Sequence, residues 1–201
     1  MKRLFVVLLG AVALFAAAPS QAQARECGLP NKTPLWIDFA DGSVPYWTMF
    51  ARPGVIAAAA NFIYPPQIRA LGAKTVYWEM NFRQRVGTPT NPQDPADVAD
   101  WADRIFYRAV ASSACATPWI ALNEMWGSNL PTPWSPTNAQ YRQNVIIFVK
   151  RLRELGARPF LLLSTRPFTD GEAVDWWREA SLYTDFVREI YFSAPQIHRQ
   201  G

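Results

Sequence analysis

The chain has 201 residues, of which half are hydrophobic, 20 are basic and 16 are acidic. A chain of this length can bury a substantial core as a single domain. The formal net charge of +4 comes without a cluster of basic residues, so the composition argues against a nucleic-acid-binding protein.

The first segment of the chain has the features of an export signal. Lys2 and Arg3 precede an uncharged run of about fifteen residues, LFVVLLGAVALFAAA, and a later AQA fits a small-residue cleavage site. The run is shorter than the roughly twenty residues that cross a bilayer. We therefore expect a signal peptide at residues 1–24 and a mature domain at residues 25–201. The mature protein is expected to be secreted or periplasmic, with a net charge of about +2 and no membrane partner.

Six apolar stretches along the chain are typical of β-strands. Most are continuous hydrophobic runs rather than alternations, which is the pattern of strands buried on both faces. The predicted strands are residues 34–39, 53–60, 74–82, 117–125, 158–164 and 188–194, and the signal is weakest at 53–60.

Helical patterns lie between these stretches. Asp94 and Ser135 each precede a proline, which is the arrangement of an N-cap followed by the first helical residue. Gly72 and Gly156 occur in the repeated pattern Leu-Gly-Ala-basic before a strand, where glycine serves as the left-handed C-cap of a helix. The predicted helices are residues 65–71, 94–110, 135–156 and 172–183.

Alternating strands and helices predict an α/β fold with parallel strands and right-handed crossovers. An open, doubly wound sheet would favour a glycine-rich phosphate loop after its first strand, and the sequence DFADGSVPYW there has none. A closed barrel is therefore favoured, although a complete one takes about 250 residues. We expect an incomplete (β/α)₈ TIM-type barrel of about six βα units, truncated after the sixth strand. A complete, smaller six-stranded α/β protein is the alternative.

Polar and aromatic residues follow the predicted strands. Because parallel strands direct their carboxyl ends to one rim, we expect these residues to gather there as a substrate site. For Asp38 a role in a turn is the alternative, and for Glu79 a salt bridge to Arg83 or Arg166. Long rim loops are predicted at 81–97 and 126–138. The candidate site residues are Asp38, Glu79, Asn81, Asn123, Glu124, Trp126 and Tyr191.

Several catalytic classes lack their usual motifs. The single histidine, His198, lies near the end of the chain, and the sequence has no GxSxG, HExxH, CxxC, Walker-type or dinucleotide-binding pattern. We therefore expect no metal and no cofactor. With these classes excluded, the remaining candidate groups are the carboxylates and the aromatic side chains, which make up 14% of the chain. Glycoside hydrolysis uses both kinds of group.

The segment IALNEMWG, residues 120–127, resembles the fourth-strand signature of the retaining glycoside hydrolases of clan A, which are (β/α)₈ barrels. The resemblance implies that Glu124 is the acid/base and that Asn123 hydrogen-bonds the substrate 2-hydroxyl. In that family the nucleophile is a glutamate at the end of strand seven, which is expected to be missing here. The implied function is that of a secreted hydrolase acting on O-glycosidic bonds of a carbohydrate, with this chain alone inactive.

Two other functions remain open at this point. One is a non-catalytic carbohydrate-binding or surface protein with a barrel fold, and the other is an α/β protein with no role in carbohydrate recognition. Two cysteines in an oxidising compartment also allow a disulfide between Cys27 and Cys115, or two separate buried thiols.

Overall fold

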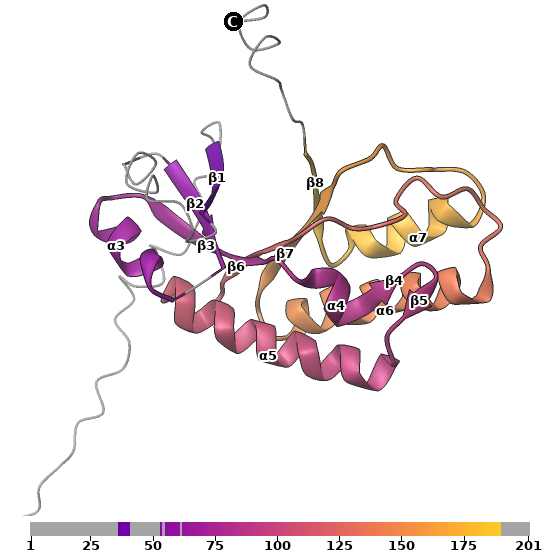
Figure 1. Ribbon diagram of the computed structural model, residues 1–201, viewed down its shortest axis with the longest axis horizontal. Helices are drawn as coiled ribbons and strands as arrows, with labels where there is room; N and C mark the ends of the chain where they lie inside the picture. The colour runs from indigo at the N-terminus through magenta and orange to yellow at the C-terminus, as the bar shows by residue number, and fades with distance from the viewer. Residues whose placement is uncertain (1–35, 41–52, 54, 61, 190–201) are drawn as a thin grey trace, which may run out of the picture.

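The computed structural model describes residues 36–40, 53, 55–60 and 62–189 (Figure 1). Its main sheet contains β1 (Trp36–Ala40), β2 (Val55–Ala59), β3 (Lys74–Glu79), β6 (Trp119–Leu122), β7 (Arg158–Leu163) and β8 (Asp185–Arg188). The helices are α3 (Tyr64–Ala70), α4 (Phe82–Val86), α5 (Pro95–Ser113), α6 (Pro136–Glu154) and α7 (Glu172–Ser181). Two short strands, β4 (Gly87–Thr88) and β5 (Asn91–Pro92), pair as an antiparallel hairpin.

All neighbouring strands of the main sheet are parallel, and their order is β1-β2-β3-β6-β7-β8. The order therefore follows the chain without a reversal. Right-handed crossovers place each connecting helix on the same face of a sheet when the strand order does not reverse. The prediction of an α/β fold with a parallel sheet is confirmed.

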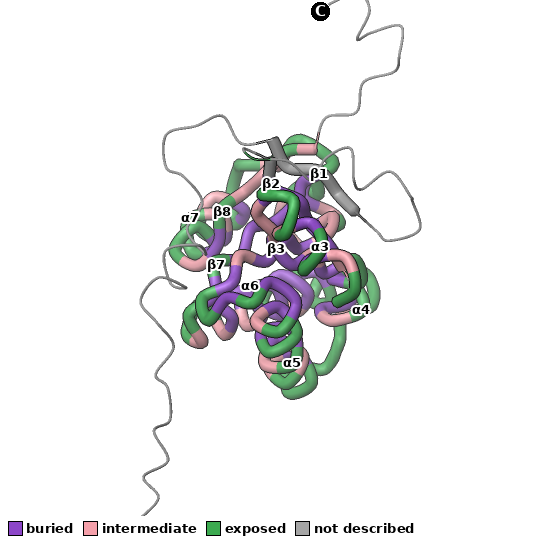
Figure 2. Tube along the Cα trace, turned by 90° about the vertical axis from the view of Figure 1, so that its left-hand side faces the viewer, coloured by how far each residue is buried: buried purple, intermediate pink, exposed green. Residues whose placement is uncertain are grey.

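The two faces of the sheet have different partners. Tyr77, Ile120 and Leu161 belong to a large buried cluster that contains residues of α4, α5, α6 and α7. Val76 and Ala121 point the other way, in a smaller buried cluster made of strand residues. Among the described residues, the helices thus cover one face of the sheet. Figure 2 shows the buried segments concentrated where strands and helices meet, with exposed segments outside.

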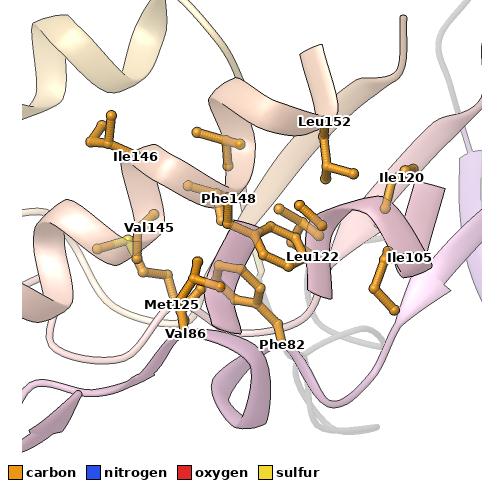
Figure 3. Packing of buried hydrophobic residues seen from close by; sticks show 14 of the residues in the cluster. Phe82, Val86, Ile105, Ile120, Leu122, Met125, Val145, Ile146, Phe148 and Leu152 are labelled. Atoms are coloured by element: carbon orange, nitrogen blue, oxygen red, sulfur yellow. The ribbon is translucent and has the colours of Figure 1, made fainter. Parts of the chain in front are cut away.

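The core on the helical face is packed around aromatic side chains. Phe82 of α4 meets Phe148 of α6 edge to face, with the ring centroids 5.4 Å apart, and Leu122 lies beside them (Figure 3). Both phenylalanines are at most 1% exposed. Truncating such a side chain to alanine typically costs about 3 to 5 kcal/mol. The contact fixes α4 against α6.

The predicted helix ends are confirmed at four positions. The Asp94 carboxylate accepts a hydrogen bond from the backbone N–H of Ala96 at 2.9 Å, and the Ser135 hydroxyl accepts one from that of Asn138 at 3.2 Å. Gly72 and Gly156 follow α3 and α6 with φ angles of +92° and +97°. An L side chain is strained in this region of backbone conformation, which explains the repeated glycine.

The sixth strand of the sheet, Asp185–Arg188, begins before the predicted strand at 188–194 and overlaps it only at Arg188, while residues 190–194 lie outside the described part of the chain. The apolar run IYF favoured the later position, but α7 ends at Ser181 and the Thr184 hydroxyl donates to the Pro159 carbonyl at 3.1 Å. Strand β8 has charged residues at both ends, and Asp185 pairs with Arg158 at 3.1 Å. Because of these charges the local sequence does not indicate a strand here, and contacts with neighbouring elements stabilise it.

The segment after the third strand is also more ordered than predicted. Strand β3 ends at Glu79, and residues 82–92 form α4 and the β4–β5 hairpin instead of a plain loop. The side-chain amide of Asn144 on α6 donates to the carbonyls of Val86 and Gln93, at 3.1 and 2.7 Å. These contacts come from a distant helix, so the local sequence does not reveal them.

Candidate functional site

A cavity of about 250 Å³ lies at the carboxyl ends of β3 and β6. The two strands are neighbours in the sheet, and the backbone N–H of Asn123 extends their ladder by donating to the Glu79 carbonyl at 3.1 Å. One wall is the turn from β3 into α4, and the other is the segment that follows β6. The lining residues are Met80, Asn81, Arg83, Gln84, Asn123, Glu124 and Trp126.

The side chain of Asn123 is oriented by an indole. The Trp78 ring nitrogen donates to the Asn123 Oδ1 atom at 3.2 Å. Because an indole N–H can only donate, the atom it meets must be the amide oxygen. The amide nitrogen of Asn123, which carries two N–H donors, is therefore the end left to bind an acceptor in the cavity.

Glu124 and Trp126 flank a buried anchor, Met125. The Met125 side chain is 1% exposed in the core, and its backbone N–H donates to the Leu162 carbonyl at 2.9 Å. Trp126 is 42% exposed, and Gly127 takes a positive φ of 66° where the chain turns away. Fixing Met125 to the core thus holds its two neighbours at the cavity.

The buried side chain of Arg142 supports the segment that follows β6. Arg142 is 2% exposed, and it donates to the Gly127 carbonyl through Nη2. Its guanidinium carbon lies 4.9, 4.8 and 5.8 Å from the ring centres of Trp134, Trp176 and Trp177. Burial lowers the pKa of Arg142 to about 10. Among the described residues no carboxylate pairs with Arg142, and three aromatic rings surround its charge instead.

Glu79 supports the opposite wall and lies outside the cavity. It is 2% exposed on the helical face, where its Oε1 atom accepts from the Asn81 backbone N–H at 3.0 Å and pairs with Arg85 Nε at 3.5 Å. Burial raises the pKa of Glu79, and the charge of Arg85 opposes that shift. Its partner is thus Arg85, where the sequence suggested Arg83 or Arg166. The contacts of Glu79 fix the turn that leads into α4.

Four of the candidate residues come together in the cavity, namely Asn81, Asn123, Glu124 and Trp126. Asp38 lies in β1, where it pairs in register with Ala57, and its side chain is outside the described part of the structure. Tyr191, Cys27 and residues 1–24, for which a signal peptide is predicted, also lie outside the described residues. Cys115 is disulfide-bonded.

Sequence reasoning missed Met80, Arg83 and Gln84 as lining residues. Arg83 extends over Trp126, with its guanidinium carbon 4.8 Å from the ring centre. Arg83 and Gln84 belong to α4, and Met80 lies in the turn between β3 and that helix. The available signal was the buried-type residue Phe82 inside an otherwise polar stretch, which indicates a turn packed on the core.

The described residues contain neither a metal-binding cluster nor a membrane-spanning helix. No group of three or more histidine, cysteine, aspartate or glutamate residues there has a metal-binding arrangement. None of the helices in that part of the chain combines the length and hydrophobicity of a membrane span.

Comparisons of the chain with protein-family models, with curated proteins and with solved structures found no match.

Proposed function

We propose that this protein is a secreted, glycoside hydrolase-like protein that binds a saccharide at the carboxyl ends of β3 and β6, with Glu124 as the general acid/base for an O-glycosidic bond. One observation carries the proposal: an amide, a carboxylate and an exposed indole, Asn123, Glu124 and Trp126, line one cavity at the rim of a parallel sheet. Strand β6 is the fourth strand of that sheet.

The proposal includes a TIM-type barrel as the architecture. Strands in chain order with helices on one face are the arrangement of a (β/α)₈ barrel. A doubly wound sheet instead reverses its strand order and has helices on both faces. The sequential order β1-β2-β3-β6-β7-β8 supports the barrel.

The lining residues have roles that follow from their chemistry. A carboxylic acid at Glu124 would protonate the leaving oxygen as the glycosidic bond breaks. The Asn123 amide nitrogen, oriented by Trp78, would donate to a sugar hydroxyl beside that bond. The Trp126 ring and Met80, which are 42% and 41% exposed, supply apolar surface for the C–H face of a sugar.

The second carboxylate decides whether the site is catalytic. A retaining mechanism needs a nucleophile about 5 to 5.5 Å from the acid/base, and Glu124 is the one carboxylate among the described residues that line the cavity. We therefore expect the 201-residue protein to bind saccharides without hydrolysing them. The same observation favours the second candidate function, a non-catalytic carbohydrate-binding protein.

The test measures binding and turnover separately. Titration of a panel of methyl and aryl glycosides, followed by calorimetry and tryptophan fluorescence, should give saturable binding without release of the aryl group. Asn123→Ala should weaken binding about five- to ten-fold, the equivalent of one hydrogen bond of about 1 to 1.5 kcal/mol. Glu124→Gln should leave binding within about two-fold, because the amide keeps the shape of the acid.

The matched control is Glu179→Gln, which removes an exposed carboxylate on α7. It should leave both binding and the melting temperature unchanged. Failure of every glycoside to bind would overturn the proposal, as would equal affinity in the wild type and Asn123→Ala. Turnover that survives Glu124→Gln would remove Glu124 from the acid/base role.

A further inference from the structure

We propose that the cavity selects a saccharide that carries a carboxylate, and that Arg83 binds this group. The inference rests on the proposed function and names its substrate class. It starts from the two charged residues that line the cavity, Glu124 on the wall after β6 and Arg83 on the wall formed by α4.

Arg83 has no ion-pair partner among the described residues. Four described arginines pair with carboxylates, namely Arg85 with Glu79, Arg151 with Asp103, Arg158 with Asp185, and Arg178 with Asp175, whereas others, such as Arg104, have no such pair. Arg83 contacts the Trp126 ring instead. The cavity thus contains a cation that no described carboxylate approaches within ion-pair distance, although Glu124 lines the same cavity.

The stacking of Arg83 leaves its hydrogen-bonding capacity available. The guanidinium carbon lies over the Trp126 ring, 4.8 Å from the ring centre, and the Arg83 side chain makes no hydrogen bond or ion pair to another described residue. A guanidinium carries five N–H donors in a fixed fork, and no described acceptor uses those of Arg83. Two parallel N–H groups match the two oxygens of a carboxylate. Stacking also restricts the side chain before a ligand binds, so less conformational entropy is lost.

The positions of Arg83 and Glu124 on opposite walls define how such a ligand would lie. A ligand carboxylate is attracted to the charge of Arg83, so it turns toward α4 and away from the β6 wall that carries Glu124. The glycosidic oxygen then faces the β6 wall. The amides of Asn81, Gln84 and Asn123 line the space between and can bind hydroxyl groups.

The size of the cavity limits the ligand. Its volume of about 250 Å³ lies below the roughly 300 to 1,000 Å³ of sites for drug-sized molecules. One sugar ring is therefore the expected occupant, and a uronic acid residue has the required carboxylate on that ring.

The experiment compares matched acidic and neutral sugars. Wild-type protein is titrated with methyl glucuronoside, methyl galacturonoside and the neutral methyl glucoside and galactoside, at low and at physiological salt. We expect at least ten-fold tighter binding of the uronosides, with a larger preference at low salt. Arg83→Gln should abolish the preference, and Arg83→Lys should keep part of it, because lysine retains the charge without the two-pronged geometry.

Arg104→Gln is the matched control. Arg104 is also an exposed arginine stacked on an indole, 5.1 Å from the ring centre of Trp101, and it does not line the cavity. This variant should keep the wild-type preference. Arg83 is exposed, so its variants should retain the wild-type melting temperature.

The possible results separate the two proposals. Equal binding of acidic and neutral sugars, or a uronoside preference that survives Arg83→Gln, overturns the inference and leaves the proposed function in place. Tighter binding of sulfated glucosides than of uronosides overturns the choice of carboxylate. Failure of all these sugars to bind overturns both.

Discussion

Replacing Arg142 by methionine tests whether the buried arginine serves the cavity more than it serves the fold. Arg142 is 2% exposed, and its pKa is lowered from 12.5 to about 10 by burial. A pKa difference of one corresponds to about 1.4 kcal/mol, so burial costs the charged side chain roughly 3 kcal/mol. Both pKa values lie above neutral pH, so the folded chain bears this cost in full at pH 7.

The contacts that stabilise the buried guanidinium contribute free energies of a size similar to this cost. The contacts of the guanidinium with Trp134, Trp176 and Trp177 contribute about 0.5 to 2 kcal/mol each. The hydrogen bond to the Gly127 carbonyl adds about 1.5 to 3 kcal/mol. Methionine keeps much of the volume and contacts aromatic rings favourably. We therefore expect Arg142→Met to cost about 1 to 2 kcal/mol, whereas Arg142→Ala should cost about 3 to 5 kcal/mol because it also leaves a cavity.

Urea denaturation of both variants gives these free energies, and glycoside titration gives the effect on the cavity. Without its tether, Gly127 no longer holds Trp126 in place, so Arg142→Met should weaken saccharide binding by about ten-fold, a loss of about 1.4 kcal/mol that is comparable with the loss in stability. A stability loss as large for methionine as for alanine would refute this reasoning. Unchanged binding in Arg142→Met would refute the positioning role.

Three further predictions concern stability. The raised pKa of Glu79 means that its carboxyl group binds a proton more tightly in the folded chain than in the unfolded chain. The protonated group therefore adds its full contribution to the free energy of unfolding below pH 4.5, and this contribution is lost as pH rises through the folded pKa. In Glu79→Gln the urea midpoint should no longer fall for this reason between pH 4 and 8. A pH dependence of the midpoint equal to that of the wild type would contradict the prediction. Gly156→Ala should cost about 1 to 2 kcal/mol through backbone strain. Gly72→Ala should cost more, since its Cβ would lie 2.9 Å from the Pro53 ring, and equal losses in thermal denaturation would exclude that contact. Cys115 is disulfide-bonded, so the denatured, unreduced protein should show no free thiol, and Cys115→Ser should cost about 2 to 4 kcal/mol.

Local signals account for the features that the sequence predicts well. Asp94 and Ser135 hydrogen-bond to N–H groups two or three residues away, and Gly72 and Gly156 are required by their own φ angles. Each of these signals depends on a few consecutive residues. They correctly predict four helices and, with the apolar runs between them, the parallel sheet.

Features that depend on distant contacts were mislocated or missed. Helix α4 has five residues, too few for a hydrophobic period, and it is held by Phe148 and by the Glu79 carboxylate. Because α4 was not predicted, Arg83 was not identified as a lining residue of the cavity. Strand alternation predicts that Trp78 and Glu79 point to opposite faces, but not which face carries the helices. The site residues after β6 were predicted because they follow directly from the end of a strand.

The sequential strand order has a consequence for how the protein assembles. Paired residues of neighbouring strands are separated by as few as 18 positions, between Ile56 and Lys74, and by at most 43, between Tyr77 and Ile120. Each strand therefore finds its partner already synthesised when it leaves the ribosome, and the sheet can grow in one direction during translation. Nascent chains halted after β6 would already contain both strands that border the cavity.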